Sequence, residues 1–127
     1  MSPHPGFQSA ELADMVALAR SAPDGYAEAV LRSSLLSVGL SMLAAGGVDD
    51  QTPHEEDEVY YAVRGVAKLR VDGDDHPVKP GSVLFVPAHV DHRFVDIEEE
   101  LVLVVFWAPP EGSVSSKQPG RSAGAGA

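Results

Sequence analysis

The feature that most limits the possible folds is a series of short β-type segments separated by turn residues. Eight of them follow position 26, bounded by glycine, proline and aspartate: residues 27–32, 35–43, 58–63, 67–71, 76–79, 82–86, 92–96 and 101–107. In residues 67–71, the apolar Ala67, Leu69 and Val71 fall on one face and basic residues on the other. Many short strands with regular turns and little helix predict a β-sandwich or a β-barrel.

Pairs of residues that contain glycine mark the expected turns. Asp72-Gly73 predicts a hairpin that joins residues 67–71 to residues 76–79. Arg64-Gly65 predicts a further turn, which would make residues 58–63 and 67–71 two separate strands.

One helix is expected before the strands, over residues 9–20. Its apolar residues recur at i, i+3, i+4 and i+7 and therefore share one face: Leu12, Met15, Val16 and Ala19. Ser9 is expected to cap this helix and Pro23 to end it. The helix should cover part of the barrel, with an arm swapped between the subunits of a dimer as the alternative.

The last strand, residues 101–107, has no polar position. A barrel has one interior, so one of two alternating sets must face outward: Leu101, Leu103, Val105 and Trp107, or Val102, Val104 and Phe106. Exposing such a set to water would forfeit roughly 1.5–3 kcal/mol for each large side chain. Cover from the helix or from a second subunit is needed, and we expect a two-fold homodimer.

Length and charge narrow the function classes. The 127 residues fit a single domain, which we place at residues 9–111 between a flexible start, residues 1–8, and a disordered tail, residues 112–127. The net charge of −10 argues against nucleic-acid and membrane partners. Cysteine is absent, which excludes disulfides and thiolate chemistry. The start lacks a secretory signal, so a cytoplasmic location is expected.

Two histidines and a glutamate carry the expected chemistry. His54 and Glu58 are four residues apart, so on an extended chain they face the same side, and His92 begins a later strand. Two imidazoles and one carboxylate inside a barrel suit a divalent ion such as iron, manganese, nickel or zinc. The alternative is a pair of hydrogen-bonded barrel histidines without metal. Residues 55–57 are interpreted as a solvated acidic loop at the barrel mouth.

These residues also fall into two motifs that resemble those of the cupin superfamily, over residues 35–109. The first superfamily motif is Gly, five residues, His-x-His, three or four residues, Glu, six residues, Gly; its counterparts here are Gly46, Thr52, His54, Glu58 and Gly65. The second is Gly, five residues, Pro-x-Gly, two residues, His; its counterparts are Gly81, Pro87, His89 and His92. Two positions depart from the motifs. Thr52 replaces the first histidine, and His89, expected at a turn or on the rim, replaces a glycine.

The resemblance implies an all-β fold, a double-stranded β-helix or jelly-roll barrel, preceded here by the short helix. It implies a metal bound by His54, Glu58 and His92, similar to the two-histidine, one-carboxylate site of non-heme iron oxygenases. Tyr60 and Phe94 follow Glu58 and His92 by two residues and are expected in a small-molecule pocket. The function implied is a dioxygenase-like metalloenzyme. The alternative is a non-catalytic module that binds a small molecule, with a degenerate or structural metal site.

Overall fold

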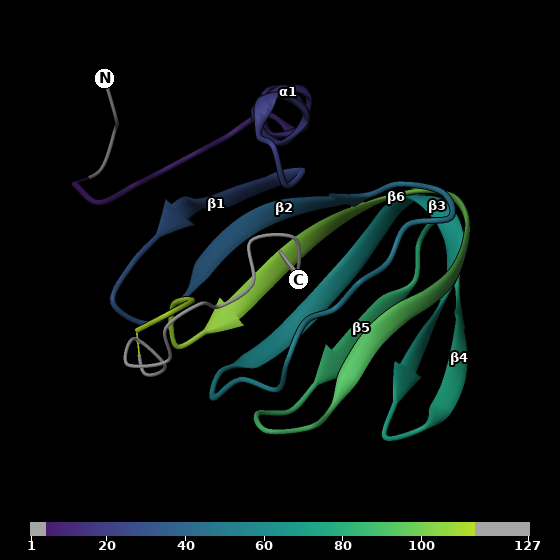
Figure 1. Ribbon diagram of the computed structural model, residues 1–127. Coiled ribbons are helices and arrows are strands. Elements are labelled where there is room, and N and C mark those ends of the chain that lie inside the picture. The colour runs from purple at the N-terminus through teal and green to yellow at the C-terminus, as the bar shows by residue number, and fades with distance from the viewer. Residues whose placement is uncertain (1–4, 114–127) are drawn as a thin grey trace.

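Two long strands, β3 (Asp57–Val71) and β6 (His92–Ala108), form the centre of the fold, and each bends near its middle (Figure 1). The computed structural model describes residues 5–113. The first half of β3 pairs with β5 (Val83–Val86), and the second half pairs with β4 (Asp74–Val78). The second half of β6 pairs with β2 (Ser37–Leu43), and β2 pairs with β1 (Tyr26–Arg32).

All these pairings are antiparallel, and the bends fold the sheet over an apolar interior (Figure 1). The expected all-β architecture with one short helix is confirmed. The hairpin at Asp72-Gly73 is also confirmed, because Val71 pairs directly with Asp74 and both turn residues have positive φ. No helix within residues 5–113 is long and apolar enough to cross a membrane.

The prediction of a turn at Arg64-Gly65 is wrong, because β3 continues through it as one strand. The register with β6 shifts three times between Ala62 and Lys68, which marks irregular, bulged pairing at the bend. Gly65 has a φ of 108°, and a Cβ atom there would lie 2.4 Å from the main-chain oxygen of Glu100. Glycine therefore allows the two paired strands to approach closely at the bend, and the chain does not reverse there. Residues 92–96 and 101–107 likewise belong to one strand, β6.

The helix α1 (Leu12–Ser21) begins later than expected. Its N-cap residue is Glu11, not Ser9, since the main-chain oxygen of Glu11 accepts hydrogen bonds from the amides of Asp14 and Met15 at 3.0 and 3.1 Å. The helix lies on the outer face of β1 and β2 (Figure 1) and is buried there through Met15 and Ala19.

The last strand divides its apolar side chains between two cores. Leu101, Leu103, Val105 and Trp107 point inward and are fully buried. On the outer face, Val102 is buried against the core that contains the helix, whereas Phe106 remains 40% exposed. The helix therefore covers only one end of this face.

Candidate metal centre

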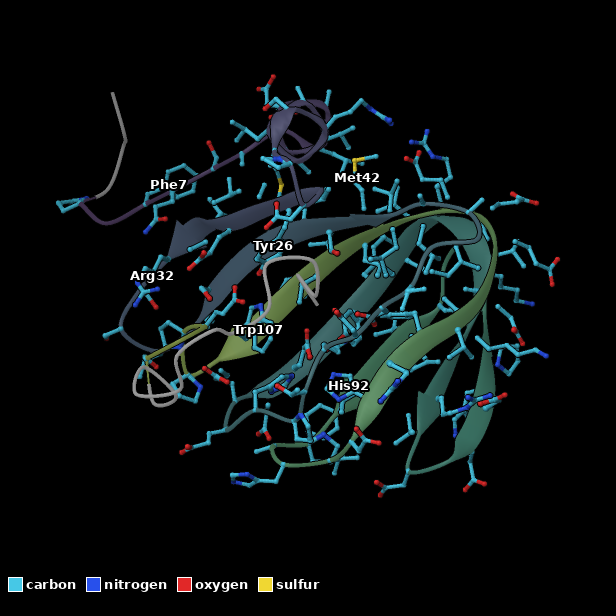
Figure 2. The ribbon with its side chains drawn as sticks, in the orientation of Figure 1. Phe7, Tyr26, Arg32, Met42, His92 and Trp107 are labelled. Atoms are coloured by element: carbon cyan, nitrogen blue, oxygen red, sulfur yellow. The ribbon has the colours of Figure 1, made fainter. Side chains whose placement is uncertain are left out.

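The structure brings together the three residues expected to bind metal. His54 lies near the end of the segment that joins β2 to β3, Glu58 lies in the first half of β3, and His92 is the first residue of β6. All three side chains are at most 3% exposed, and one potential ligand atom from each lies within 4.8 Å of the others. In Figure 2 His92 points into the barrel interior.

The hydrogen bonds of the two histidines determine which ring nitrogen faces the centre. His54 Nδ1 lies 3.1 Å from the main-chain oxygen of Glu56, and His92 Nδ1 lies 2.9 Å from that of Val90. A carbonyl oxygen only accepts hydrogen bonds, so each Nδ1 carries a proton and donates it. In a neutral imidazole the other nitrogen, Nε2, then presents a lone pair.

Both Nε2 atoms point at the same carboxylate oxygen. Glu58 Oε1 lies 2.9 Å from Nε2 of His54 and 3.1 Å from Nε2 of His92. Two nitrogen lone pairs and an anionic oxygen at these distances repel one another unless a cation lies among them, either a proton or a metal ion. The second oxygen, Glu58 Oε2, is buried and has no hydrogen-bond partner in the described part of the chain, residues 5–113.

The electrostatic surroundings favour positive charge at this centre. Burial works against protonation of His92, but the hydrogen bond and the negative charge of Glu58 outweigh it, so the pKa of His92 is raised. Within residues 5–113 the buried charged side chains include four carboxylates, those of Asp49, Glu56, Glu58 and Glu111, and no lysine or arginine. A bound cation would therefore be held by negative charge without competition from a buried lysine or arginine among these residues.

Aromatic side chains surround the histidines. The Tyr60 hydroxyl lies 3.1 Å from His92 Nε2, and the Trp107 ring packs edge-on against His54 with centroids 4.6 Å apart. Burial, followed by the charges of Glu58 and Asp49, raises the pKa of Tyr60 well above its usual range, so this hydroxyl stays protonated. Phe94 packs against Tyr60 at 4.9 Å and forms the wall behind it.

The two positions that depart from the motifs both face outward. Thr52 and His89 are exposed. His89 has a φ of 69°, the left-handed conformation that glycine adopts most easily, which explains why the second motif has glycine at this position. His89 contributes its main chain, since its amide donates to the main-chain oxygen of His54 at 2.7 Å.

Three further buried polar residues near the centre were missed or misjudged from the sequence. Asp49 and Gln51 lie in the segment before β3 and are 2% and 3% exposed. Glu56 is fully buried, so the interpretation of residues 55–57 as a solvated loop is wrong for this residue. Its carboxylate accepts a hydrogen bond from the Gly112 amide at 2.7 Å and lies 3.7 Å from His54 Nδ1. No periodicity marks these positions, because residues 44–56 form no regular strand.

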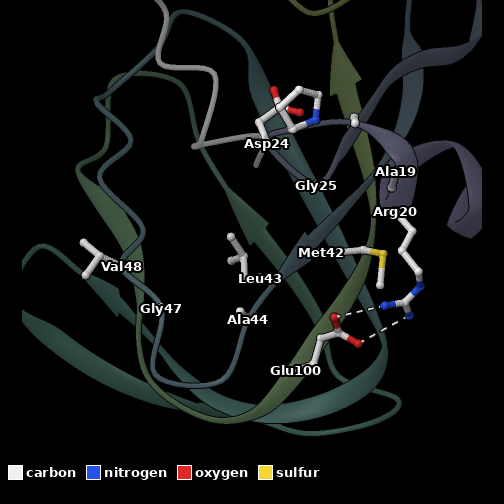
Figure 3. A pocket seen from close by; sticks show the side chains of 12 residues that line it. Ala19, Arg20, Asp24, Gly25, Met42, Leu43, Ala44, Gly47, Val48 and Glu100 are labelled. Carbon is white, nitrogen blue, oxygen red and sulfur yellow. Dashed lines mark hydrogen bonds and ion pairs between the residues drawn. The ribbon is translucent and has the colours of Figure 1, made fainter.

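A separate surface cavity of about 420 Å³ lies at the C-terminal end of α1 (Figure 3). Gly25, Met42 and Gly47 contribute to its lining, and Arg20 pairs across it with Glu100 at 3.5 Å. Its lining includes none of the three potential metal ligands. This cavity is therefore distinct from the candidate metal centre.

Comparison with known proteins decides the family. The sequence profile described as the cupin domain matches residues 39–109, more than half of the chain. This chain belongs to the cupin family. An uncharacterized protein of Streptomyces coelicolor is 46% identical to this cupin over 92 residues, which cover 72% of the chain and 88% of that protein.

Solved structures agree with this assignment. A structure from Thermus thermophilus has 29% identity and a TM-score of 0.66, covering 81% of this chain and 98% of its own. An RmlC-like cupin with a double-stranded β-helix fold, from Methanocaldococcus jannaschii, has 19% identity and a TM-score of 0.60, covering 69% and 83%. The expected double-stranded β-helix is thus confirmed.

Proposed function

We propose that this cupin holds one divalent metal ion between His54, Glu58 and His92 and uses it to act on a small molecule inside the barrel. The observation that carries this proposal is the convergence of two imidazole Nε2 atoms on one carboxylate oxygen, at 2.9 and 3.1 Å. The main-chain hydrogen bonds at each Nδ1 hold both rings in the orientation that ligation requires. A metal ion would replace this repulsion with three coordinate bonds.

The donor set indicates the class of chemistry. Two neutral imidazoles and one carboxylate suit iron, manganese, nickel or zinc, and an octahedral ion held by three protein atoms keeps open positions. An oxygenase is the reaction class that this arrangement favours. The protonated hydroxyl of Tyr60 would donate a hydrogen bond to a molecule at the open positions, with Phe94 behind it. The metal would supply Lewis-acid or redox chemistry when bound.

Nitric oxide tests whether the centre keeps open positions. We expect protein loaded anaerobically with ferrous iron to give a high-spin iron–nitrosyl electron paramagnetic resonance signal when nitric oxide is added, because this ligand needs a free coordination position. His92→Ala protein treated in the same way should give no such signal. A wild-type centre that binds iron but not nitric oxide would favour a structural metal and contradict the catalytic proposal.

We further propose that this cupin forms a two-fold homodimer through the outer face of β3, β5 and β6. Exposed apolar side chains gather there: Tyr61 pairs with Val83, and Phe85 and Phe106 pair with Val59 from its two sides. Leu36, Val59, Phe85 and Phe106 line an apolar groove of about 210 Å³ on this face. Burial of this face against a second copy would complete the cover that the helix provides at only one end.

Light scattering after size exclusion tests the dimer. We expect a mass of twice 13.4 kDa for the wild type at micromolar concentrations. Phe85→Asp places a charge in the centre of the proposed interface and should shift the protein to monomer. Val48→Asp is the matched control, because Val48 is 83% exposed and lies outside this face. A wild-type mass near 13.4 kDa at every concentration would contradict the proposal.

A further inference from the structure

Gln51, not Thr52, is the side chain that the segment before β3 turns into the barrel. The first cupin motif would place a metal-binding histidine at position 52, but Thr52 is exposed and its neighbour Gln51 is only 3% exposed. In a regular strand, residues 51 and 54 would face opposite sides. Residues 44–56 form no regular strand, so Gln51 and His54 can both be buried although they are three positions apart.

The hydrogen bonds of Gln51 identify its free atom. Its Nε2 donates to Asp49 Oδ2 at 2.7 Å, and the same oxygen accepts the Phe94 amide at 2.8 Å. A carboxylate only accepts hydrogen bonds, so the amide must turn its nitrogen toward Asp49. The carbonyl oxygen, Gln51 Oε1, is left buried and without a hydrogen-bond partner among residues 5–113. A buried oxygen without a partner is unfavourable, so it calls for a partner that the described part of the chain does not supply.

Gln51 is anchored next to the metal centre. Asp49 holds it against the main chain of Phe94, two residues after His92 on the same strand. Its amide also interacts with the hydroxyl of Tyr60, which lies 3.1 Å from His92 Nε2. Within residues 5–113, the buried side-chain oxygens without a hydrogen-bond partner are Asp49 Oδ1, Gln51 Oε1 and Glu58 Oε2. All three belong to this one region, and a cation satisfies such oxygens directly.

We propose that Gln51 Oε1 is a fourth protein ligand of the metal ion, in place of the side chain at position 52. This inference rests on the proposed metal site. An amide oxygen is a neutral, hard donor, so it completes the coordination without adding charge to a centre that already contains Glu58. Carbonyl and carboxylate oxygens suit manganese better than an all-nitrogen set does. Gln51 therefore shifts the preference of the centre toward manganese and away from zinc.

Metal titration of four proteins tests the assignment: wild type, Gln51→Leu, Gln51→Glu and Thr52→Ala. We expect Gln51→Leu to bind Mn²⁺ at least roughly 10-fold more weakly, because the lost group is a ligand and even supporting residues cost 10–100-fold. Its affinity for Zn²⁺ should fall less, so the ratio of the two affinities should change. Gln51→Glu keeps an oxygen donor but loses the hydrogen bond to Asp49, so its Mn²⁺ affinity should fall less than that of Gln51→Leu. Thr52→Ala should match the wild type within about twofold.

The outcomes separate this inference from the proposed function. If the wild type binds Mn²⁺ and Gln51→Leu binds it equally well, Gln51 is not a ligand and the three-residue site stands. If the wild type binds neither Mn²⁺ nor Zn²⁺, the proposed metal site itself is overturned. Melting curves of the metal-free proteins establish that each is folded, and Gln51→Ala provides the same comparison if the leucine variant unfolds.

Discussion

His92→Ala protein should bind divalent metal roughly 100-fold or more weakly than the wild type, because it loses one of the three proposed ligand atoms. The Nε2 atom of His92 lies 3.1 Å from Glu58 Oε1, and its ring is oriented by the main-chain oxygen of Val90 at 2.9 Å. Alanine leaves only one imidazole and the carboxylate of the proposed three-residue set, and these compete poorly with water for a first-row ion. This is the largest effect on function that we expect from one substitution.

Elemental analysis of protein purified without a histidine tag measures the effect. His76→Ala is the matched control, because His76 lies on β4, is exposed, and is absent from the cluster of potential ligands. Equal metal content in the wild type and in His92→Ala would refute the assignment. His76→Ala should retain the metal content of the wild type.

Thermal melting gives a second readout of the same site. A metal that binds only the folded state at 100 times its dissociation constant stabilises the protein by about 2.7 kcal/mol. A chelator should remove this contribution from the wild type and lower its Tm by roughly 10–20 °C for a domain of this size. The Tm of His92→Ala should not respond to the chelator, because little metal is bound to begin with.

The residues of the candidate centre were predictable where the chain is regular. Glu58, Tyr60, His92 and Phe94 lie on strands, and the alternation of a strand determines which side chains share a face. The two motifs located Glu58 and His92, and the alternation along each strand then placed Tyr60 and Phe94 two residues further on. The structure accordingly brings Glu58 and His92 together with His54.

The same reasoning located His54 but missed the other buried polar residues in the segment before β3. Gln51 donates a hydrogen bond to Asp49 in the same irregular segment, and Glu56 accepts one from the distant Gly112. Neither contact leaves a repeat in the sequence. A run of three acidic residues has the composition of a solvated loop, and this composition is the same whether or not one of the carboxylates is buried. Only the three-dimensional contacts distinguish Glu56 from the exposed Glu55 and Asp57.

Gly65 shows a different limit, because one residue type serves two backbone roles. A glycine between two apolar segments is typical of a turn, and Gly73 is a turn glycine of this kind. Gly65 also has positive φ, but its neighbour in space is the main chain of Glu100 and Leu101 on β6. The sequence contains no local signal that separates a reversal of the chain from a close approach of two paired strands.

Gly65→Ala should therefore be the substitution most damaging to the fold. Its Cβ atom would lie 2.4 Å from the main-chain oxygen of Glu100 and 2.7 Å from Cα of Leu101, and neither atom can move without shifting β6. The positive φ adds strain of about 1–3 kcal/mol. We expect a total loss of roughly 3–5 kcal/mol in the free energy of unfolding, near the upper limit for one substitution.

Gly73→Ala separates the overlap from the strain. Gly73 has a φ of 88°, and a Cβ atom there would meet nothing within 4 Å, so its replacement introduces backbone strain alone. Denaturant unfolding of both variants should show a loss of about 1 kcal/mol for Gly73→Ala and a several-fold larger loss for Gly65→Ala. Equal losses of stability in the two variants would mean that β3 and β6 do not approach each other closely at Gly65. Since the bend places the two halves of β3 and β6 over one interior, such a result would also call into question the geometry that brings Glu58 and His92 together.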